Sequence, residues 1–225
     1  MKVLLINNFF YNRGGDCTYT LSLGRLLESK GHEVFYFCMK HPNNKEYEYS
    51  NYFTGYIDYN LMRSNINIQN SIKVLTKSIY SFESQNQLLQ LLNVINPDIA
   101  HINGIQEHIT PSILKILTNH DIPIFWTLHD YKLLCPEAHF LSQGTVCESC
   151  FKRKYYKCLT NKCKKDSYLA SGVAALGSYV HSFLKIDQKV ERFIAPSNFL
   201  KNKFIEFGWP EEKITLIRNF LINKT

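Results

Sequence analysis

The stretch Ile122-Pro-Ile-Phe-Trp-Thr-Leu128, followed directly by His129-Asp130, decides the fold. Its apolar, β-branched and aromatic residues are typical of a buried strand, and the polar pair marks the strand's end. In an open α/β sheet, ligands bind outside the carboxyl ends of the strands. We therefore expect His129 and Asp130 to lie at a ligand-binding edge of a sheet.

Segments of the same kind alternate with helical patterns on both sides of this strand. Five further strands are predicted, at residues 2–6, 33–39, 98–102, 192–195 and 213–217. Helices are predicted after Asp16, at residues 79–95, 111–118 and 167–190, and from Ser197 to Gly208. Residues 41–71 are expected to form long loops, with one doubtful strand at residues 52–57. This alternation predicts an α/β protein with a doubly wound parallel sheet, Rossmann-like, whose two faces are covered.

The turn after the first strand contains Gly14 and Gly15, just before the first helix. Paired glycines there would let backbone N–H groups approach a phosphate at the helix N-terminus. The alternative is an ordinary tight turn, because the G-x-G-x-x-G spacing and the acidic ribose partner of a dinucleotide site are absent. A nucleotide-dependent oxidoreductase is disfavoured for the same reason.

Residues 132–166 form an insertion that carries both the basic charge and most of the cysteines. The chain has 26 Lys and Arg, 19 Asp and Glu, and a net charge of +7, and seven basic residues with no acidic one lie within residues 151–165. Without those seven the charges balance, which argues for one local basic patch and against a nucleic-acid-binding body. Residues 152–165 are expected to contact anionic membrane lipid or an acceptor phosphate. The alternative is a solvated charged loop.

Five of the seven cysteines lie in this region: Cys135, Cys147, Cys150, Cys158 and Cys163. The spacing of the last four suits one tetrahedral Zn²⁺ bound by four thiolates, and Cys135 is a fifth candidate that could replace one of them. Free thiols and disulfides are the alternatives, and a metal here would be structural because no open ligand position is implied. Cys17 and Cys38 are expected to be buried thiols.

Four segments in this order resemble the amino-terminal, acceptor-side domain of the family-4 retaining glycosyltransferases of the GT-B fold. They are Gly14-Gly15 after the first strand, Pro97-Asp-Ile-Ala-His-Ile-Asn103, Thr127-Leu-His-Asp-Tyr131 with Cys135-Pro136, and Ala195-Pro-Ser197 followed by Lys213-Ile-Thr-Leu-Ile-Arg-Asn219. The resemblance implies that residues 1–225 are the amino-terminal Rossmann-like domain and that residues 219–225 begin the interdomain linker. It also implies a carboxy-terminal domain, absent from this sequence, that binds a nucleotide-sugar donor.

The resemblance assigns His129, with Asp130, to the catalytic edge of the sheet. It also makes Gly14, Gly15, His101 and Asn103 candidate contacts for acceptor or donor, with Glu107 and His108 as looser candidates. An imidazole at this place can hydrogen-bond a sugar hydroxyl or orient an attacking one. The alternative for His129 is a satisfied polar group that merely ends the strand, and Ser197 is interpreted first as a helix N-cap.

The expected function is the acceptor-binding half of a hexosyltransferase-like enzyme, which transfers sugar from a nucleotide-sugar donor to a saccharide or lipid-linked acceptor in polysaccharide biosynthesis. The half alone is expected to be inactive. The competing hypothesis is a non-enzymatic, zinc-stabilised binding module. Apolar residues at 45% and charged residues at 20% are ordinary for a globular protein, and neither a spanning apolar run nor a signal peptide is visible. A cytoplasmic protein, peripheral at the inner face of the membrane, is therefore expected.

Overall fold

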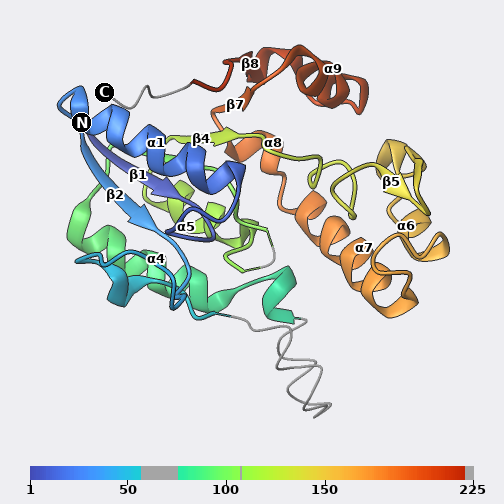
Figure 1. The fold of residues 1–225 in the computed structure, drawn as a ribbon, viewed down its shortest axis with the longest axis horizontal. Helices are drawn as coiled ribbons and strands as arrows, with labels where there is room; N and C mark the ends of the chain where they lie inside the picture. The colour runs from blue at the N-terminus through green and yellow to red at the C-terminus, as the bar shows by residue number, and fades with distance from the viewer. Residues whose placement is uncertain (57–75, 107, 221–225) are drawn as a thin grey trace, which may run out of the picture.

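A computed structural model describes residues 1–56, 76–106 and 108–220 (Figure 1). Its main sheet has six strands in the order β2-β1-β3-β4-β7-β8, and every neighbouring pair is parallel. The strands are β1 (Lys2–Ile6), β2 (Glu33–Phe37), β3 (Ile99–Ile102), β4 (Ile124–Thr127), β7 (Arg192–Ala195) and β8 (Ile214–Leu216). The six predicted strands and the doubly wound parallel sheet are therefore confirmed.

Helices cover both faces of this sheet (Figure 1). The larger ones are α1 (Gly15–Ser29), α4 (Phe82–Ile95), α5 (Leu114–Asn119), α7 (Tyr168–Phe183) and α9 (Asn198–Glu206). Shorter helical segments are η1 (Ser50–Tyr52), η2 (Pro111–Ile113), η3 (Phe151–Arg153), α6 (Tyr156–Thr160), α8 (Ile186–Lys189) and η4 (Glu211–Lys213).

The alternation of side chains along β1 divides the hydrophobic core between the two faces. Leu4 and Ile6 belong to the larger cluster, which includes residues of α4, α5 and α9. Val3 and Leu5 belong to the cluster that contains Leu21 of α1. Both faces of the sheet are thus buried, as parallel sheets require.

The helix boundaries follow local capping signals. The predicted helix at residues 79–95 begins instead at Phe82, because the Ser81 side chain caps it by accepting a hydrogen bond from the backbone N–H of Ser84. The predicted helix at residues 167–190 is broken into α7 and α8 at Lys185, which has a left-handed φ of 50°. Ser167 and Ser197 cap α7 and α9 in the same way, so the N-cap interpretation of Ser197 is confirmed.

The doubtful strand at residues 52–57 is largely a wrong prediction. Residues 50–52 form η1, and Thr54 makes only an isolated parallel bridge with Met39. Ile57, like Glu107, lies outside the described residues. Phe53 turns inward beside Phe10 and Tyr47, so this segment is anchored by aromatic packing rather than by a strand ladder.

The connection from β4 to β7 makes a lobe beyond the edge of the sheet, at the right of Figure 1. It contains the antiparallel hairpin of β5 (Leu141–Ser142) and β6 (Thr145–Val146), then α6 packed against α7. Leu134, Cys135 and Phe140 join the main core at its base. Within the described residues, no helix is both long enough and apolar enough to cross a bilayer.

Candidate functional site

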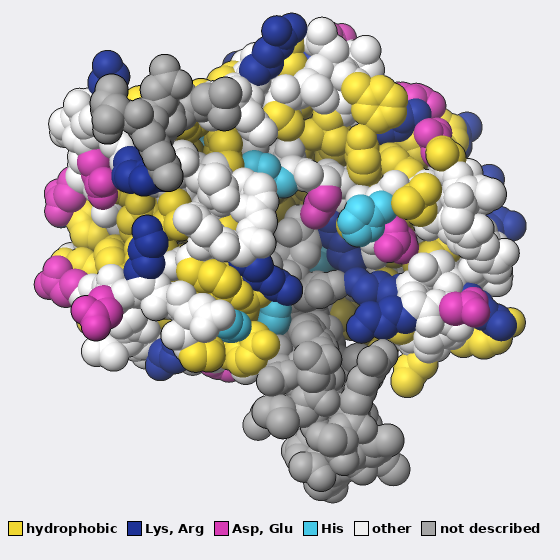
Figure 2. Space-filling model, in the orientation of Figure 1, with side chains coloured by type: hydrophobic (Ala, Val, Ile, Leu, Met, Phe, Trp, Pro, Cys, Tyr) yellow, Lys and Arg dark blue, Asp and Glu magenta, His cyan; other side chains and the backbone are white. Residues whose placement is uncertain are grey.

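A cleft of about 660 Å³ lies at the carboxyl ends of β1, β3 and β4, a size typical of small-molecule sites. Its lining comes from the turns after these strands, the start of α1, the base of the lobe, and Asn219 near the end of the described chain. On the face drawn in Figure 2, basic, acidic and histidine side chains gather in the middle, between the sheet and the lobe. The cleft therefore lies where ligands of open α/β sheets bind.

His129 follows β4 and lines this cleft. Its Nε2 lies 3.1 Å from Oδ1 of Asn103, which follows β3 and lines the same cleft. Because the amide oxygen can only accept, Nε2 carries the proton and Nδ1 is left as the basic nitrogen. Burial lowers the pKa of His129, and the Asp16 carboxylate opposes this shift in part. At neutral pH the imidazole is uncharged and able to accept a proton or a hydroxyl hydrogen bond.

Asn103 has one unused donor at the cleft. Its side chain is only 1% exposed, and within the described residues its Nδ2 has no hydrogen-bond partner. Buried polar groups without partners are rare in folded proteins, and this donor is therefore a candidate contact for a ligand in the cleft.

His101 lies behind the cleft rather than on its lining. Its Nε2 is 2.7 Å from the hydroxyl oxygen of Thr127 on the neighbouring strand. Burial, with a smaller contribution from His129, lowers the pKa of His101 to about 4. The side chain is not among the described residues that line the cleft, so this histidine joins β3 to β4 beneath the site.

Asp130 lines the cleft next to His129 and turns the chain into the lobe. Its Oδ1 accepts a hydrogen bond of 2.8 Å from the backbone N–H of Lys132. Burial raises the pKa of Asp130, and the hydrogen bond from Lys132 opposes that rise. This Asx-type turn fixes the direction of the backbone as it leaves β4.

Asn7 and Gly104 join the ends of β1 and β3 under the cleft. Asn7 Oδ1 accepts a hydrogen bond of 2.9 Å from the backbone N–H of Gly104. A Cβ atom at Gly104 would stand 2.6 Å from Oδ2 of Asp16 and 2.9 Å from Oδ1 of Asn7. Glycine is required here because two polar side chains approach the backbone closely.

Gly14 and Gly15 line the cleft at the start of α1, where Gly14 is the N-cap and Gly15 the first helical residue. The backbone of Gly14 is extended, with a φ of −160°, which any residue can adopt. The N-terminus of α1 therefore opens onto the cleft, and a side chain at Gly15 would meet no atom within 4 Å.

Several cleft residues were not identified from the sequence. They are Asn8, Arg13, Asp16, Gln106, Lys132, Glu137, His139 and Asn219. The lobe contributes three of them, and no local pattern marks those three because they reach the sheet edge only through the folding of the lobe. Lys164, from the basic segment that is predicted to contact lipid or an acceptor phosphate, also lines the cleft. Tyr19 of α1 also stacks edge-on against His129, with ring centroids 5.1 Å apart.

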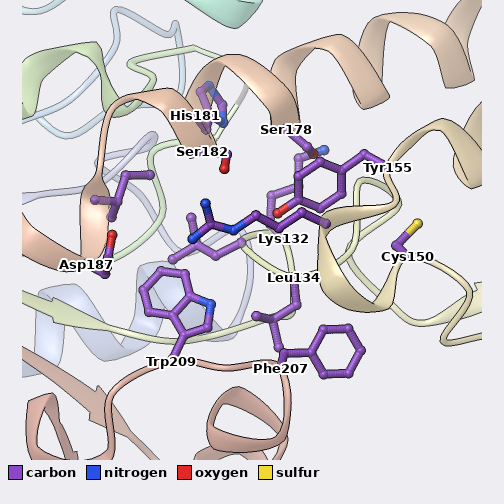
Figure 3. Close-up of a pocket in the computed structure, with 13 residues that line it drawn as sticks. Lys132, Leu134, Cys150, Tyr155, Ser178, His181, Ser182, Asp187, Phe207 and Trp209 are labelled. Atoms are coloured by element: carbon purple, nitrogen blue, oxygen red, sulfur yellow. The ribbon is translucent and has the colours of Figure 1, made fainter.

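A second cavity lies in the seam between the lobe and the sheet body (Figure 3). Tyr155 and Cys150 reach it from the lobe, His181 from α7, and Phe207 and Trp209 from the chain after α9. Its volume of about 40 Å³ is close to that of one water molecule, so it is no substrate site. His181 is tied here by a 3.0 Å hydrogen bond from Nε2 to the carbonyl of Ile79, and burial lowers its pKa to about 4.

Three of the five lobe cysteines share one small core. Cys150, Cys158 and Cys163 pack with Tyr155 and Tyr179 in a small core of the lobe. Burial raises the pKa of Cys150 and of Cys158 to about 12 in each, with neighbouring thiols adding to the shift. Across the described residues, no three His, Cys, Asp or Glu side chains are grouped so that they could hold an ion.

Zinc at Cys147, Cys150, Cys158 and Cys163 therefore stays a prediction. All seven cysteines are free thiols in this structure, and Cys135 belongs to the main core rather than to the lobe's own. Cys17 and Cys38 are buried, as predicted.

The comparison with protein families gives one match, to the model of Glycosyltransferase Family 4, over residues 13–221. No curated protein matches the chain.

Among solved structures, the chain is similar to HepE of Anabaena in complex with UDP-glucose, with a TM-score of 0.50 and 14% identity over 98% of this chain and 44% of that one. UDP-N-acetylglucosamine 2-epimerase from Rickettsia bellii is also similar, with a TM-score of 0.45 and 12% identity over 97% of this chain and 45% of that one. The chain thus spans less than half the length of these two solved structures.

Proposed function

Because this chain belongs to glycosyltransferase family 4, we propose that it is the acceptor-binding half of an enzyme that transfers a sugar from a nucleotide-sugar donor to a saccharide or lipid-linked acceptor. The observation that carries the proposal is the pair His129 and Asn103, hydrogen-bonded to each other at the cleft beyond the sheet's carboxyl end.

The proposed role of this pair is to bind and orient an acceptor hydroxyl. Neutral His129 offers Nδ1 as the acceptor of the hydroxyl proton, which is general-base chemistry of the kind that imidazole provides near neutral pH. Asn103 offers its unpartnered Nδ2 as a donor to the same or a neighbouring oxygen. A hydroxyl group both donates and accepts hydrogen bonds, so it can donate to His129 Nδ1 and accept from Asn103 Nδ2.

Asp130 is proposed to hold His129 in place through the turn that it closes with Lys132. His101 is proposed to act one layer deeper, as a positioning residue that keeps β3 and β4 in register through Thr127. The geometry favours the predicted contact of His101 with a ligand least, because His101 does not line the cleft and its Nε2 is already bonded to Thr127.

The donor side is proposed to be completed by a second domain. Gly14 and Gly15 bring the N-terminus of the 15-residue helix α1 to the cleft, where its partial positive charge can face the phosphates of a donor held by that domain. Residues 1–225 are proposed to be the amino-terminal domain, with residues 219–225 as the start of the linker. The likeness to HepE, which is described with UDP-glucose, guides the choice of donor for a first experiment.

The test is sugar transfer by the protein expressed from the complete reading frame that contains this chain. Radiolabelled UDP-glucose is incubated with that protein and a lipid extract of the producing cells, and label in the lipid fraction is counted. His129→Ala is expected to lower transfer by about 10²- to 10⁴-fold, the usual contribution of a general base. Exposed His120→Ala is the matched control, and circular dichroism checks the fold of both.

Equal transfer by the His129→Ala and His120→Ala variants would remove His129 from the mechanism. If the complete protein transfers no label from any of a panel of UDP-, GDP- and dTDP-sugars, the enzymatic proposal itself is wrong.

A further inference from the structure

Helix α7 presents an apolar stripe to solvent. Leu169, Leu176 and Phe183 are 73%, 55% and 86% exposed, and half-buried Val173 and Val180 lie between them. The spacing of these five residues, four and three in alternation, puts them on one helical face. From Tyr168 to Phe183 the helix contains no Lys, Arg, Asp or Glu.

The opposite face of α7 is held firmly, so the exposure of the stripe is not that of a loose helix. Ser171, Ala175 and Ser178 are buried on that face. Near the N-terminal end, a Cβ atom at Gly172 would stand 3.5 Å from Cδ1 of Leu159 in α6. Near the other end, His181 hydrogen-bonds the carbonyl of Ile79.

Aromatic and basic side chains continue the stripe beyond the start of α7. Tyr168 and Tyr156 are 60% and 48% exposed. The ammonium of Lys162 lies 4.6 Å from the ring centroid of Tyr168, and that of Lys157 lies 5.5 Å from the ring centroid of Tyr156. We call these tyrosines, Leu159 and the exposed stripe the α6–α7 surface: Tyr156, Leu159, Tyr168, Leu169, Leu176 and Phe183.

The segment that precedes α7 in the chain carries charge of one sign. Residues 151–165 hold seven basic and no acidic residue, and Lys152, Lys154 and Lys165 are exposed. Asp166, which is exposed, and Asp187 in α8 are the acidic residues that flank α7 in the chain. Apolar side chains for the acyl region, tyrosines for the interface and lysines for the headgroups are the combination found on helices that lie in a membrane surface.

We propose that the α6–α7 surface docks on a bilayer that contains anionic lipids, with α7 lying in the interface and the lysines of the lobe contacting phosphate headgroups. A protein partner or a second copy would cover the apolar stripe but would leave the cations of residues 151–165 without a counter-charge. An anionic bilayer offers acyl chains to the apolar stripe and phosphates to the lysines, so we favour it over a protein partner or a second copy.

The docking proposal stands apart from the proposed transfer chemistry, although it fits with it. Lys164 lines the cleft, and its backbone N–H donates a 2.9 Å hydrogen bond to Ser171 Oγ of α7. A membrane-bound α7 would therefore lie next to the cleft, where a lipid-linked acceptor could reach it.

The test is flotation, with vesicles, of the protein expressed from the complete reading frame that contains this chain, and no sugar transfer is measured. We expect the protein to float at low salt with vesicles made of equal parts phosphatidylglycerol and phosphatidylcholine, and to dissociate when the salt approaches about 1 M, where charges are screened within about 3 Å. Leu169→Glu combined with Leu176→Glu is expected to weaken binding at least tenfold. Phe82→Glu is the matched control, because Phe82 on α4 is also 73% exposed but lies in another helix, and it is expected to bind as the unmodified protein does.

Four results would overturn the proposal. The first is no flotation with the anionic vesicles at low salt, and the second is equal weakening by the control and by the double variant. The third is a concentration-dependent dimer, seen by analytical ultracentrifugation, that the double variant dissociates, because the stripe would then join two copies. Equal flotation with pure phosphatidylcholine would remove the anionic lipid from the proposal.

Discussion

His129 shows how one residue's surroundings set its chemistry. The ring is held by Asn103 and packed edge-on against Tyr19, and burial removes the water that would stabilise its charged form. Asp16, from the start of α1, is the group that favours the charged form. The protonation of His129 is thus set by parts of the chain that are far apart in sequence.

Replacement of Asp16 by Asn is expected to lower the pKa of His129 further, because the variant removes the carboxylate that stabilises the imidazolium. NMR titration of the His129 ring resonances measures this, with exposed Glu33→Gln as the control. A rise of the pKa in Asp16→Asn would contradict the electrostatic account.

The lobe cysteines are the second place where single residues decide a property. Three of them make up half of the lobe's own small core, so this part of the chain has little apolar packing to stabilise it. Four thiolates on one Zn²⁺ would carry a net charge of −2, which the nearby cations can offset.

The spacing of these cysteines in the sequence, and not their placement in this structure, predicts that protein purified without chelator contains one zinc per chain by atomic emission. Cys150→Ser and Cys158→Ser should each lose the metal and lower the melting temperature of the lobe, whereas Cys17→Ala should keep it. A chain that contains no zinc and shows seven titratable thiols after unfolding would establish free cysteines instead.

At the scale of elements, α1 and β2 pack closely because one helix position has no side chain. Gly24 lies on the buried face of α1, and a Cβ atom there would collide with the hydroxyl and ring of Tyr36. Tyr36 cannot easily turn away, since it is 7% exposed and its ring packs on Phe10 and Tyr47.

Gly24→Ala is expected to lower the free energy of unfolding by up to about 2 kcal/mol, because an overpacking cost of about 1–3 kcal/mol outweighs the gain of about 1 kcal/mol in helix propensity. Urea denaturation measures the change. Gly15→Ala in the same helix, where the added methyl meets no atom within 4 Å, is the control and should not lower stability. Stabilisation by Gly24→Ala would show that Tyr36 has room to move.

Across the whole molecule, two buried histidines couple folding to pH. The pKa values of His101 and His181 are both lowered to about 4, mainly by burial. The unfolded chain binds a proton at each below about pH 6.5, while the folded chain does not. Their contribution to stability is therefore complete above about pH 6.5 and is lost as the pH falls towards 4.

The free energy of unfolding is predicted to fall between pH 6.5 and 4 by up to about 1.4 kcal/mol per pH unit for each of these histidines. Urea unfolding at several pH values measures the slope. His181→Gln, which can still donate to the carbonyl of Ile79, should remove about half of it, with His120→Gln as the control. An unchanged slope in His181→Gln would contradict the assignment.

The sequence by itself determined the six strands, the α/β fold with a parallel sheet, and the polar groups at the ends of the strands. The reason is that buried parallel strands are continuous apolar runs and that serine caps and glycine stops act within a few residues. Sequence patterns predicted secondary structure less well where tertiary contacts outweigh them. Phe53 is anchored by aromatic rings and not by a strand, and α7 is separated from α8 at Lys185.

Only the tertiary structure decided which polar residues share the cleft. It placed His101 beneath the cleft, because His101 lies within β3 and its ring bonds Thr127 of β4, whereas Asn103 follows the strand and lines the cleft. It also brought Lys164 back to the sheet edge and left the stripe of α7 facing solvent. Local periodicity shows that a helix has an apolar face, but the neighbours that cover that face, or leave it for a membrane, are set by the packing of the whole chain.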